Sequence, residues 1–362
     1  MSPAAPSLAA PSLCLAPMLG LGLAAPQQGS GWWPRGALYA ADFRKHRYMA
    51  GGRSITPAAA FSLTRGGEAL APDSAGSYQG FAAHVPARTD LGLFLSPVVS
   101  NAIADTTGTG ASLSTTDTLN GLPGSWGQSR VDGSAIRARI TAKGSFGSLP
   151  YVDVRFWGNS TATDLQLFFS NAEDQHLGIT AGSSAAVLSN VNLVLAAGSL
   201  GNVTCRLRLT ELAAGNVYLT KQIETVVPPA AMALELAHFS KNWTVQNSGT
   251  SRLRFGLELT LSGAFDLTLR IAGAHLELSP AANLAARGLA APVPTRGSPV
   301  SRPADALTLH LPQGTRSVTL TAGTGATLTL DTSAATAAGP AGLSVPESPF
   351  GAAPLITAVG RR

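Results

Sequence analysis

The stretch Arg252-Leu253-Arg254-Phe255-Gly256-Leu257-Glu258-Leu259 places a large apolar residue at every second position, between charged residues and one glycine. Successive side chains of a β-strand point to opposite sides, so this period of two predicts a strand with one buried and one solvated side. The same alternation occurs before and after it, in Ile136–Thr141, Tyr151–Trp157, Leu165–Phe169, Cys205–Thr210 and Leu267–Ile271. Antiparallel sheets with one solvated face produce this pattern.

Such runs follow one another from Trp126 to Ser279, roughly 10–15 residues apart, with turns rich in Gly, Asn and Ser between them. The spacing predicts an all-β protein whose main domain is an antiparallel sandwich of two sheets. The order of the strands along the chain is compatible with a jelly roll and with an immunoglobulin-like sandwich.

Three other segments carry a resemblance to a known family: Gly92–Asn101 (GLFLSPVVSN), Ile271–Glu277 (IAGAHLE) and Pro294–Asp305 (PTRGSPVSRPAD). In order and spacing they are similar to the G-L-L-I-E-x-x-R-T-N-L, G-A-Q-L-E and T-x-G…T-R-x-A-D segments of phage and prophage virion proteins. The similarity is to fibres and spikes of the type found on the heads of gene transfer agents. This chain has Ser96 and Val99 where the family has Glu and Arg.

The resemblance implies a jelly-roll, carbohydrate-binding-like module in a spike or fibre on the surface of a phage-like particle. Its implied function is attachment to a host through bacterial surface polysaccharide, such as a capsule. The implied partners are that polysaccharide, capsid or tail proteins, and further copies of the chain, with a trimer as the default for fibres. Two other readings stay open: a purely structural virion protein without affinity for glycans, and an exported, lectin-like bacterial adhesin.

Changes in composition divide the chain into five expected parts. Residues 1–30 are a flexible leader or a peptide that attaches to the virion, and 31–103 a small β-rich domain. Residues 104–125 form a linker rich in Gly and Thr. The jelly roll follows in 126–290, and 291–362 form a β tail rich in Pro and Ala. Because the tail strands are light and lack aromatic residues, we expect the tail to need a partner, most simply another copy of the chain.

The leader contains an apolar stretch, Leu13–Ala25, which allows three interpretations. It is an attachment peptide, a disordered leader or the core of a signal peptide, although no Lys or Arg precedes it as a signal peptide usually requires. Pro and Gly interrupt it, and it is too short to span a membrane as a helix. No membrane partner is therefore expected.

Charged residues make up only 12% of the chain, and the net charge is +5. Nearly all of the positive charge is Arg, which is more often a mark of GC-rich coding than of function. The functional alternative is a surface that attracts acidic polymers, including anionic polysaccharides. The Arg residues are scattered without a basic run, so nucleic-acid binding is not expected. We expect no disulfide between the two cysteines, Cys14 and Cys205.

No pattern in the sequence indicates catalysis or a cofactor. Glycan hydrolysis needs two carboxylates that face each other across the sugar, and no pair of acidic residues is marked out by spacing. The six His residues are dispersed without the spacing of a metal site. We therefore predict a protein that is not an enzyme and holds neither a metal nor another cofactor.

A sugar-binding surface needs aromatic rings beside polar side chains on a solvated sheet face. On the predicted strand Tyr151–Trp157, one side carries Tyr151, Asp153, Arg155 and Trp157, opposite three apolar residues. These four residues are the predicted carbohydrate site, together with Asn159 and Trp243. The alternative is that Trp157 covers the edge of the core and that Asp153 and Arg155 form a surface ion pair of little energetic value.

Overall fold

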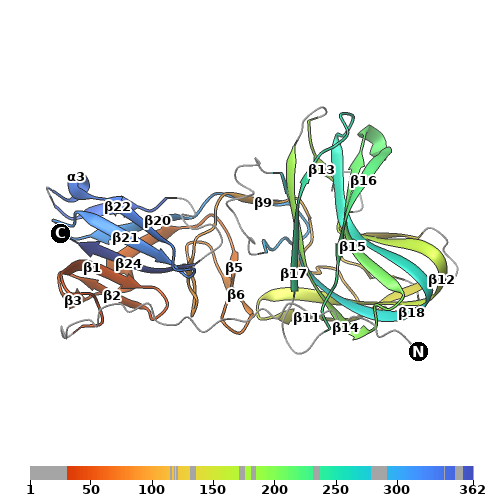
Figure 1. Cartoon of the computed structure of the whole chain (residues 1–362), viewed down its shortest axis with the longest axis horizontal. Helices are drawn as coiled ribbons and strands as arrows, with labels where there is room; N and C mark the ends of the chain where they lie inside the picture. Colours follow the sequence, from red (N-terminus) through yellow and green to blue (C-terminus); the bar gives the residue numbers. More distant parts are fainter. Residues whose placement is uncertain are drawn as a thin grey trace, which may run out of the picture.

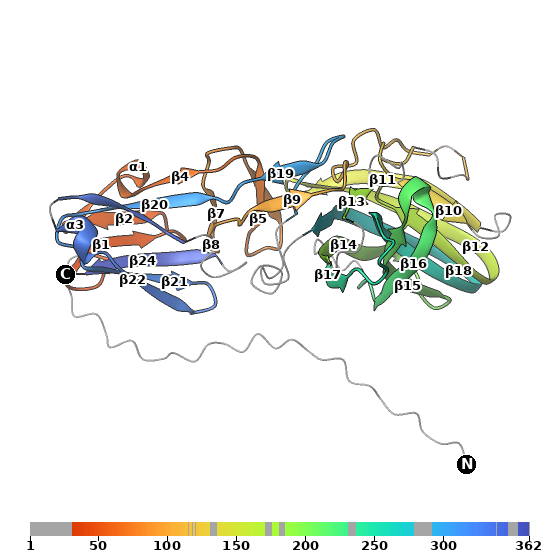
Figure 2. The same cartoon turned by 90° about the horizontal axis from the view of Figure 1, so that it is seen from above.

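In a computed structural model the chain is an antiparallel, all-β protein of two lobes that lie end to end (Figures 1 and 2), which confirms the predicted fold class. The structure describes residues 31–361 except 115, 118, 120, 131–135, 171–175, 181–184, 231–236, 279–291, 338 and 347–353. The leader 1–30, with Leu13–Ala25, lies outside the described residues. Among those described, no helix has the length and apolar character to cross a membrane.

The larger lobe is the predicted sandwich. Its strands are β10 (Gly127–Arg130), β11 (Ile136–Phe146), β12 (Leu149–Phe168), β13 (Leu177–Gly178), β14 (Ala186–Gly198), β15 (Val203–Leu212), β16 (Tyr218–Val226), β17 (Ala237–Thr244) and β18 (Arg252–Leu278). A short 3-10 helix, η2 (Ala214–Asn216), joins β15 to β16.

Two strands, β12 and β18, are long enough to belong to both layers of the sandwich. The first sheet has the order β11-β12-β18-β14-β17 and uses the first half of β12 with the second half of β18. The second sheet has the order β10-β12-β18-β15-β16 and uses the other halves. The change of layer falls where the pairing of β12 with β18 is irregular, between Thr161 and Thr163, next to Gly263, which pairs with Ser160. Gly263 has φ +75°, which a residue with a side chain rarely adopts.

The core of the sandwich forms from the apolar residues of the alternating runs, which confirms the alternation read from the sequence. Val152, Val154 and Phe156 of β12 are buried against Leu257 and Leu269 of β18. Cys205 is also buried there, and the burial raises the pKa of its thiol to about 12. The opposite face of each sheet points away from this core, and we call it the outer face of that sheet.

The smaller lobe combines both ends of the described chain. Its strands are β1 (Ala37–Asp42), β2 (Arg47–Ala50), β3 (Arg53–Ser54), β4 (Phe61–Thr64), β5 (Ala69–Pro72), β6 (Tyr78–Phe81), β7 (Ala87–Thr89), β8 (Gly92–Phe94), β20 (Ala306–Leu311), β21 (Ser317–Ala322), β22 (Thr327–Asp331), β23 (Ala341–Ser344) and β24 (Leu355–Arg361). Two single-turn helices, α1 (Pro57–Ala60) and α3 (Ser333–Thr336), accompany them. The strands β9 (Val99–Asn101) and β19 (Val300–Arg302) pair between the lobes.

The segments 31–103 and 291–362, expected as separate parts, pair with each other strand by strand. The N-terminal strand β1 lies beside β24, and β4 lies beside β20. Apolar residues from both segments share one core, among them Tyr39, Phe43, Leu309, Val318 and Leu320. The partner that buries the light C-terminal strands is therefore the N-terminal segment of the same chain. These strands do not require a second copy of the chain, contrary to our expectation from the sequence.

A buried ion pair joins the two segments of the small lobe. The side chains of Arg65 and Asp305 are 1% and 0% exposed, and the Arg65 guanidinium donates to both carboxylate oxygens of Asp305. Two further N–H groups donate to the carbonyl oxygens of Val85, at 2.8 Å, and Phe94, at 3.0 Å. The backbone N–H of Ser96 also donates to Asp305, at 2.8 Å. Both charges are thus fully compensated, as burial requires.

The three segments of the family resemblance meet where the lobes join. The Asn101 side chain donates to the carbonyl oxygens of Ala274 and Val293 and accepts from the backbone N–H of Leu276, all at 3.1 Å. Glu277 accepts from the backbone N–H of Ser100 at 3.3 Å. The segment 300–302 pairs with 99–101 as β19 beside β9. These contacts tie the end of β18 to the small lobe.

We predict that replacing one member of the Arg65–Asp305 pair destabilises the protein strongly. Arg65→Met leaves the Asp305 carboxylate buried without its cation, and the expected loss is about 3–5 kcal/mol of unfolding free energy. Denaturant unfolding at neutral pH measures this loss.

The matched control is Arg137→Met, which breaks the exposed Arg137–Asp117 pair, in which the side chains are 59% and 45% exposed. Its expected effect is below about 1 kcal/mol. Equal losses in the two variants would contradict the assignment of Arg65–Asp305 as the structural tie.

Candidate functional site

Four of the predicted site residues lie together on the outer face of the first sheet. Tyr151, Asp153, Arg155 and Trp157 alternate along β12 with the buried Val152, Val154 and Phe156. We use the name β12 face for the four, together with Asn159 and three neighbours described below: Arg139, Asp266 and Arg270.

The end of the β12 face near Tyr151 is held by a bidentate ion pair between adjacent strands. Arg270 of β18 donates to both carboxylate oxygens of Asp153, at 2.7 and 2.8 Å. These hydrogen bonds raise the pKa of Arg270 above its usual value. The same guanidinium lies 3.9 Å from the centre of the Tyr151 ring, a cation–π contact. The ring is thereby fixed from one side.

The other end centres on Trp157, whose side chain is partly exposed. Arg155 lies 4.9 Å from the centre of an indole ring and Arg139 of β11 lies 5.6 Å away. Arg155 is in turn held by Asp266, which accepts from it at 2.9 and 2.6 Å. These hydrogen bonds lower the pKa of Asp266 and raise that of Arg155. Because both partners are at least one-third exposed, their main effect is to orient Arg155 over the ring.

A hollow of about 350 Å³ adjoins the face at Tyr151. Its lining combines the loop residues Thr107 and Gly108 with Lys143, Gly144 and Val152 of the first sheet. Lys143 donates to the carbonyl oxygen of Ala111 at 2.8 Å, which fixes its ammonium group at the rim. A space of this size beside an aromatic ring is large enough to hold one end of a small polar ligand.

The remaining two predicted residues are placed differently. Asn159 is exposed on β12 beyond Trp157, opposite Ala264. Trp243 is 4% exposed in the core of the sandwich, and its indole N–H donates to the Ser189 hydroxyl at 2.7 Å. Trp243 is therefore separated from the β12 face by the first sheet and is not part of the surface that we describe.

The alternative ion pair, between Asp153 and Arg155, is not the pairing observed, since both residues are paired across to β18. Asp266 and Arg270, as well as Arg139, were missed as site residues. Each lies on the solvated side of an alternating run, which is a signal in the sequence. The strand register that brings those runs beside β12 cannot be read from the sequence.

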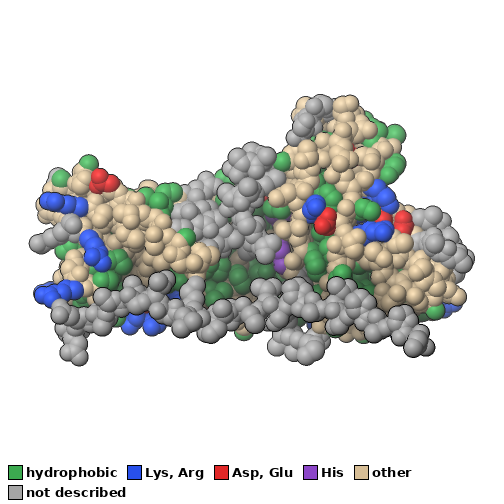
Figure 3. All heavy atoms as spheres, in the orientation of Figure 1, with side chains coloured by type: hydrophobic (Ala, Val, Ile, Leu, Met, Phe, Trp, Pro, Cys, Tyr) green, Lys and Arg blue, Asp and Glu red, His purple; other side chains and the backbone are tan. Residues whose placement is uncertain are grey.

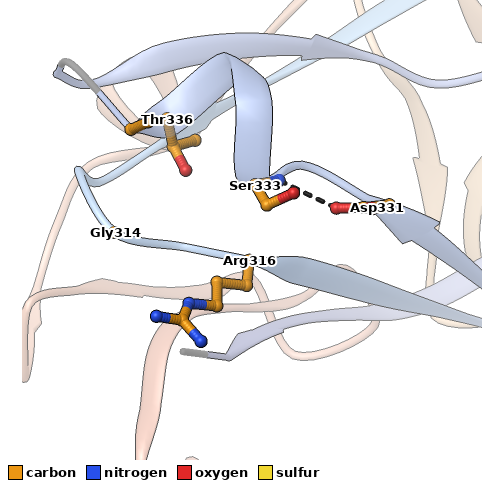
Figure 4. Close-up of a pocket in the computed structure, with 6 residues that line it drawn as sticks. Gly314, Arg316, Asp331, Ser333 and Thr336 are labelled. Atoms are coloured by element: carbon orange, nitrogen blue, oxygen red, sulfur yellow. Dashed lines mark hydrogen bonds between the residues drawn. The ribbon is translucent and has the colours of Figure 1, made fainter.

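A second hollow, of about 790 Å³, lies at the far end of the small lobe, between α3 and the chain from Gly314 to Arg316 (Figure 4). Asp331 there accepts from the backbone N–H of Ser333 at 2.9 Å, while Arg316 points away from that pair. The polar groups do not converge on a point, so we assign no site to it. Within the described residues, no group of three or more His, Cys, Asp or Glu side chains is placed to hold a metal ion.

No protein-family model matches the sequence, and no curated protein matches it. Three solved structures show what the fold is similar to. An arabinose-bound MgGH51 α-L-arabinofuranosidase aligns with a TM-score of 0.32 and 9% identity over 51% of this chain and 27% of its own. The tailspike protein 4 enzymatically active domain of bacteriophage CBA120 aligns at 0.29 and 7%, over 49% and 21%.

The CBM22-1 xylan-binding domain from Paenibacillus barcinonensis Xyn10C aligns with a TM-score of 0.28 and 12% identity, over 51% of this chain and 97% of that domain. The aligned part of this chain spans about a quarter of the arabinofuranosidase and about a fifth of the tailspike domain. Matches at these TM-scores assign neither a family nor a function.

Proposed function

We propose that this protein binds a polysaccharide through the β12 face. The observation that carries the proposal is the partly exposed Trp157 indole, held beside Arg155, which is itself fixed by Asp266. An aromatic ring offers an apolar surface to the C–H groups of a sugar ring. The guanidinium and carboxylate groups around it form strong, directional hydrogen bonds with hydroxyl groups.

The arrangement favours binding because it is rigid before the ligand arrives. Two bidentate ion pairs, Asp153–Arg270 and Arg155–Asp266, fix the polar groups, so little side-chain freedom is lost on binding. Asp153 is 5% exposed and Tyr151 packs with Leu70 and Tyr78 of the small lobe, so a sugar would contact the end of the face around Arg155, Trp157 and Asn159. The proposed activity is binding without cleavage of the glycan.

We further propose that the protein is a spike or fibre on the surface of a phage-like particle, and that its ligand is the capsular polysaccharide of a host. The support for this is the resemblance of Gly92–Asn101, Ile271–Glu277 and Pro294–Asp305 to virion proteins. In the structure these segments form the junction between the lobes, which gives them an architectural role. Capsid or tail proteins and further copies of the chain are the proposed partners.

We predict that Trp157→Ala weakens retention on immobilised bacterial capsular polysaccharides by about tenfold or more, since it removes the apolar platform. A panel of purified capsules, assayed for bound protein and for released reducing ends, measures both binding and cleavage. We expect binding without release.

The matched control is Tyr218→Ala, which removes another exposed aromatic side chain, on the edge strand β16. It should bind as the unaltered protein does. No retention of the unaltered protein on any capsule, or equal retention of the Trp157→Ala protein, would overturn the β12 face as a binding site.

The particle assignment predicts where the protein is found in cells that produce it. The full chain should sediment with capsid proteins in a density gradient and should be absent from the fraction of exported soluble proteins. Recovery in the exported fraction alone would favour the adhesin over the spike.

A further inference from the structure

The outer face of the second sheet carries a cluster of charged side chains that is independent of the β12 face. Glu258 of β18 is fully buried there and accepts from Arg208 at 2.6 Å and from Lys221 at 2.7 Å. Arg206 lies 3.5 Å from the same carboxylate and donates to Thr260 at 2.6 Å. Figure 3 shows charged side chains gathered on this part of the sandwich, where Figure 1 places β15, β16 and the bent part of β12.

The contacts show that the second sheet curls around this cluster. Lys221 on β16 lies 3.6 Å from Asp164 on β12, although β15 and β18 lie between these strands. In register the two residues are also six positions apart, so on a flat sheet they would be on the order of 20 Å apart or more. Two side chains cannot span that distance. We call this part of the outer face of the second sheet the curled face.

The curled face has more positive than negative charge. Its cations are Arg206, Arg208, Lys221 and Arg254, and its anions are Asp164 and Glu258. The guanidinium of Arg254 lies 3.7 Å from the centre of the Phe168 ring, and its Nε–H is buried without a hydrogen-bond partner among the described residues. Burial, with the nearby charge of Arg208, lowers the pKa of Arg254 to about 10, so it is still charged at neutral pH.

The cations differ in how firmly they are held. Arg208 is 6% exposed and is bound closely to Glu258, so this pair forms a fixed floor. Arg206 and Lys221 are 26% and 31% exposed. Each combines one short hydrogen bond, from Arg206 to Thr260 at 2.6 Å and from Lys221 to Glu258 at 2.7 Å, with one long contact, to Glu258 at 3.5 Å and to Asp164 at 3.6 Å. Those long contacts can be exchanged for an external anion while the buried pair stays intact.

We propose that the curled face binds the carboxylate groups of an acidic polysaccharide, with Arg206 and Lys221 as the exchangeable contacts. The excess of cations favours a polyanion, and the curl of the sheet favours a narrow, extended chain. Threonine and glutamine side chains on the same face, among them Thr204, Gln166 and Thr225, are available for sugar hydroxyls. This site goes beyond the β12 face and does not depend on it.

The test compares two forms of one backbone, polygalacturonate and its fully methyl-esterified form. We expect the protein to bind polygalacturonate in low salt and to leave the uncharged ester unbound. Its affinity should fall steeply between roughly 50 and 500 mM NaCl, because salt screens the attraction between the cations and the carboxylate groups. The double variant Arg206→Gln/Lys221→Gln should bind polygalacturonate at least about tenfold more weakly than the unaltered protein. The single variant Lys221→Arg, which keeps the positive charge, should bind polygalacturonate more tightly than the single variant Lys221→Gln.

The control for charge is Arg53→Gln/Arg316→Gln, which removes two exposed cations from the small lobe and should bind normally. Thermal unfolding shows whether each variant is folded. Trp157→Ala should retain polygalacturonate binding. The experiment therefore distinguishes an error in the proposal for the β12 face from an error in the proposal for the curled face. Equal binding of the acid and the ester, unchanged binding by the double variant, or a preference for double-stranded DNA over polygalacturonate would overturn the proposal.

Discussion

The buried ion pair between Arg65 and Asp305 is the constraint on which the arrangement of the chain depends. The two residues are 240 positions apart, and the whole sandwich lies between them in the sequence. Their pairing requires the chain to leave the small lobe, complete the sandwich and return to the same place. Asp305 also binds the backbone of Ser96, which sets the course of the chain into β9. The pairing of β9 with β19 and the contacts of Asn101 then fix the sandwich against the small lobe.

Both proposed binding sites lie on the outer faces of the sandwich. The two faces use charge differently. On the β12 face, ion pairs between neighbouring strands orient side chains around the partly exposed Trp157. On the curled face, the charges converge on the buried Glu258, and cations outnumber anions. The first arrangement suits sugar hydroxyls and C–H groups, and the second suits an anionic group.

Much of the sandwich was predictable because period-two alternation depends only on which side of a strand is buried. The runs around Val152, Leu207 and Leu257 are strands of the structure for that reason. Alternation does not reveal which strands are neighbours. The union of 31–103 with 291–362 therefore required the structure, since β1 and β24 are joined by contacts between residues about 320 positions apart.

The site shows the same limit. Tyr151, Asp153, Arg155 and Trp157 were assigned to one side of a strand from their spacing, and they occupy one side in the structure. Trp243 was grouped with them because it is aromatic, but the side of β17 on which it lies follows from the pairing with Val187 of β14. Lys221 and Asp164 meet only because the second sheet curls, and sheet curvature is not encoded in any local pattern.

The central claim, that ligands bind to the outer faces of the sandwich and not to the junction or the small lobe, is tested most directly by amide hydrogen exchange. Exchange of the full chain would be measured alone and with a capsular polysaccharide on which it is retained. The account predicts slower exchange in β11, β12 and β18, or in β15 and β16 if the ligand is acidic, with β1, β20, β21 and β24 unchanged. Protection confined to the small lobe or to β9 and β19 would contradict it.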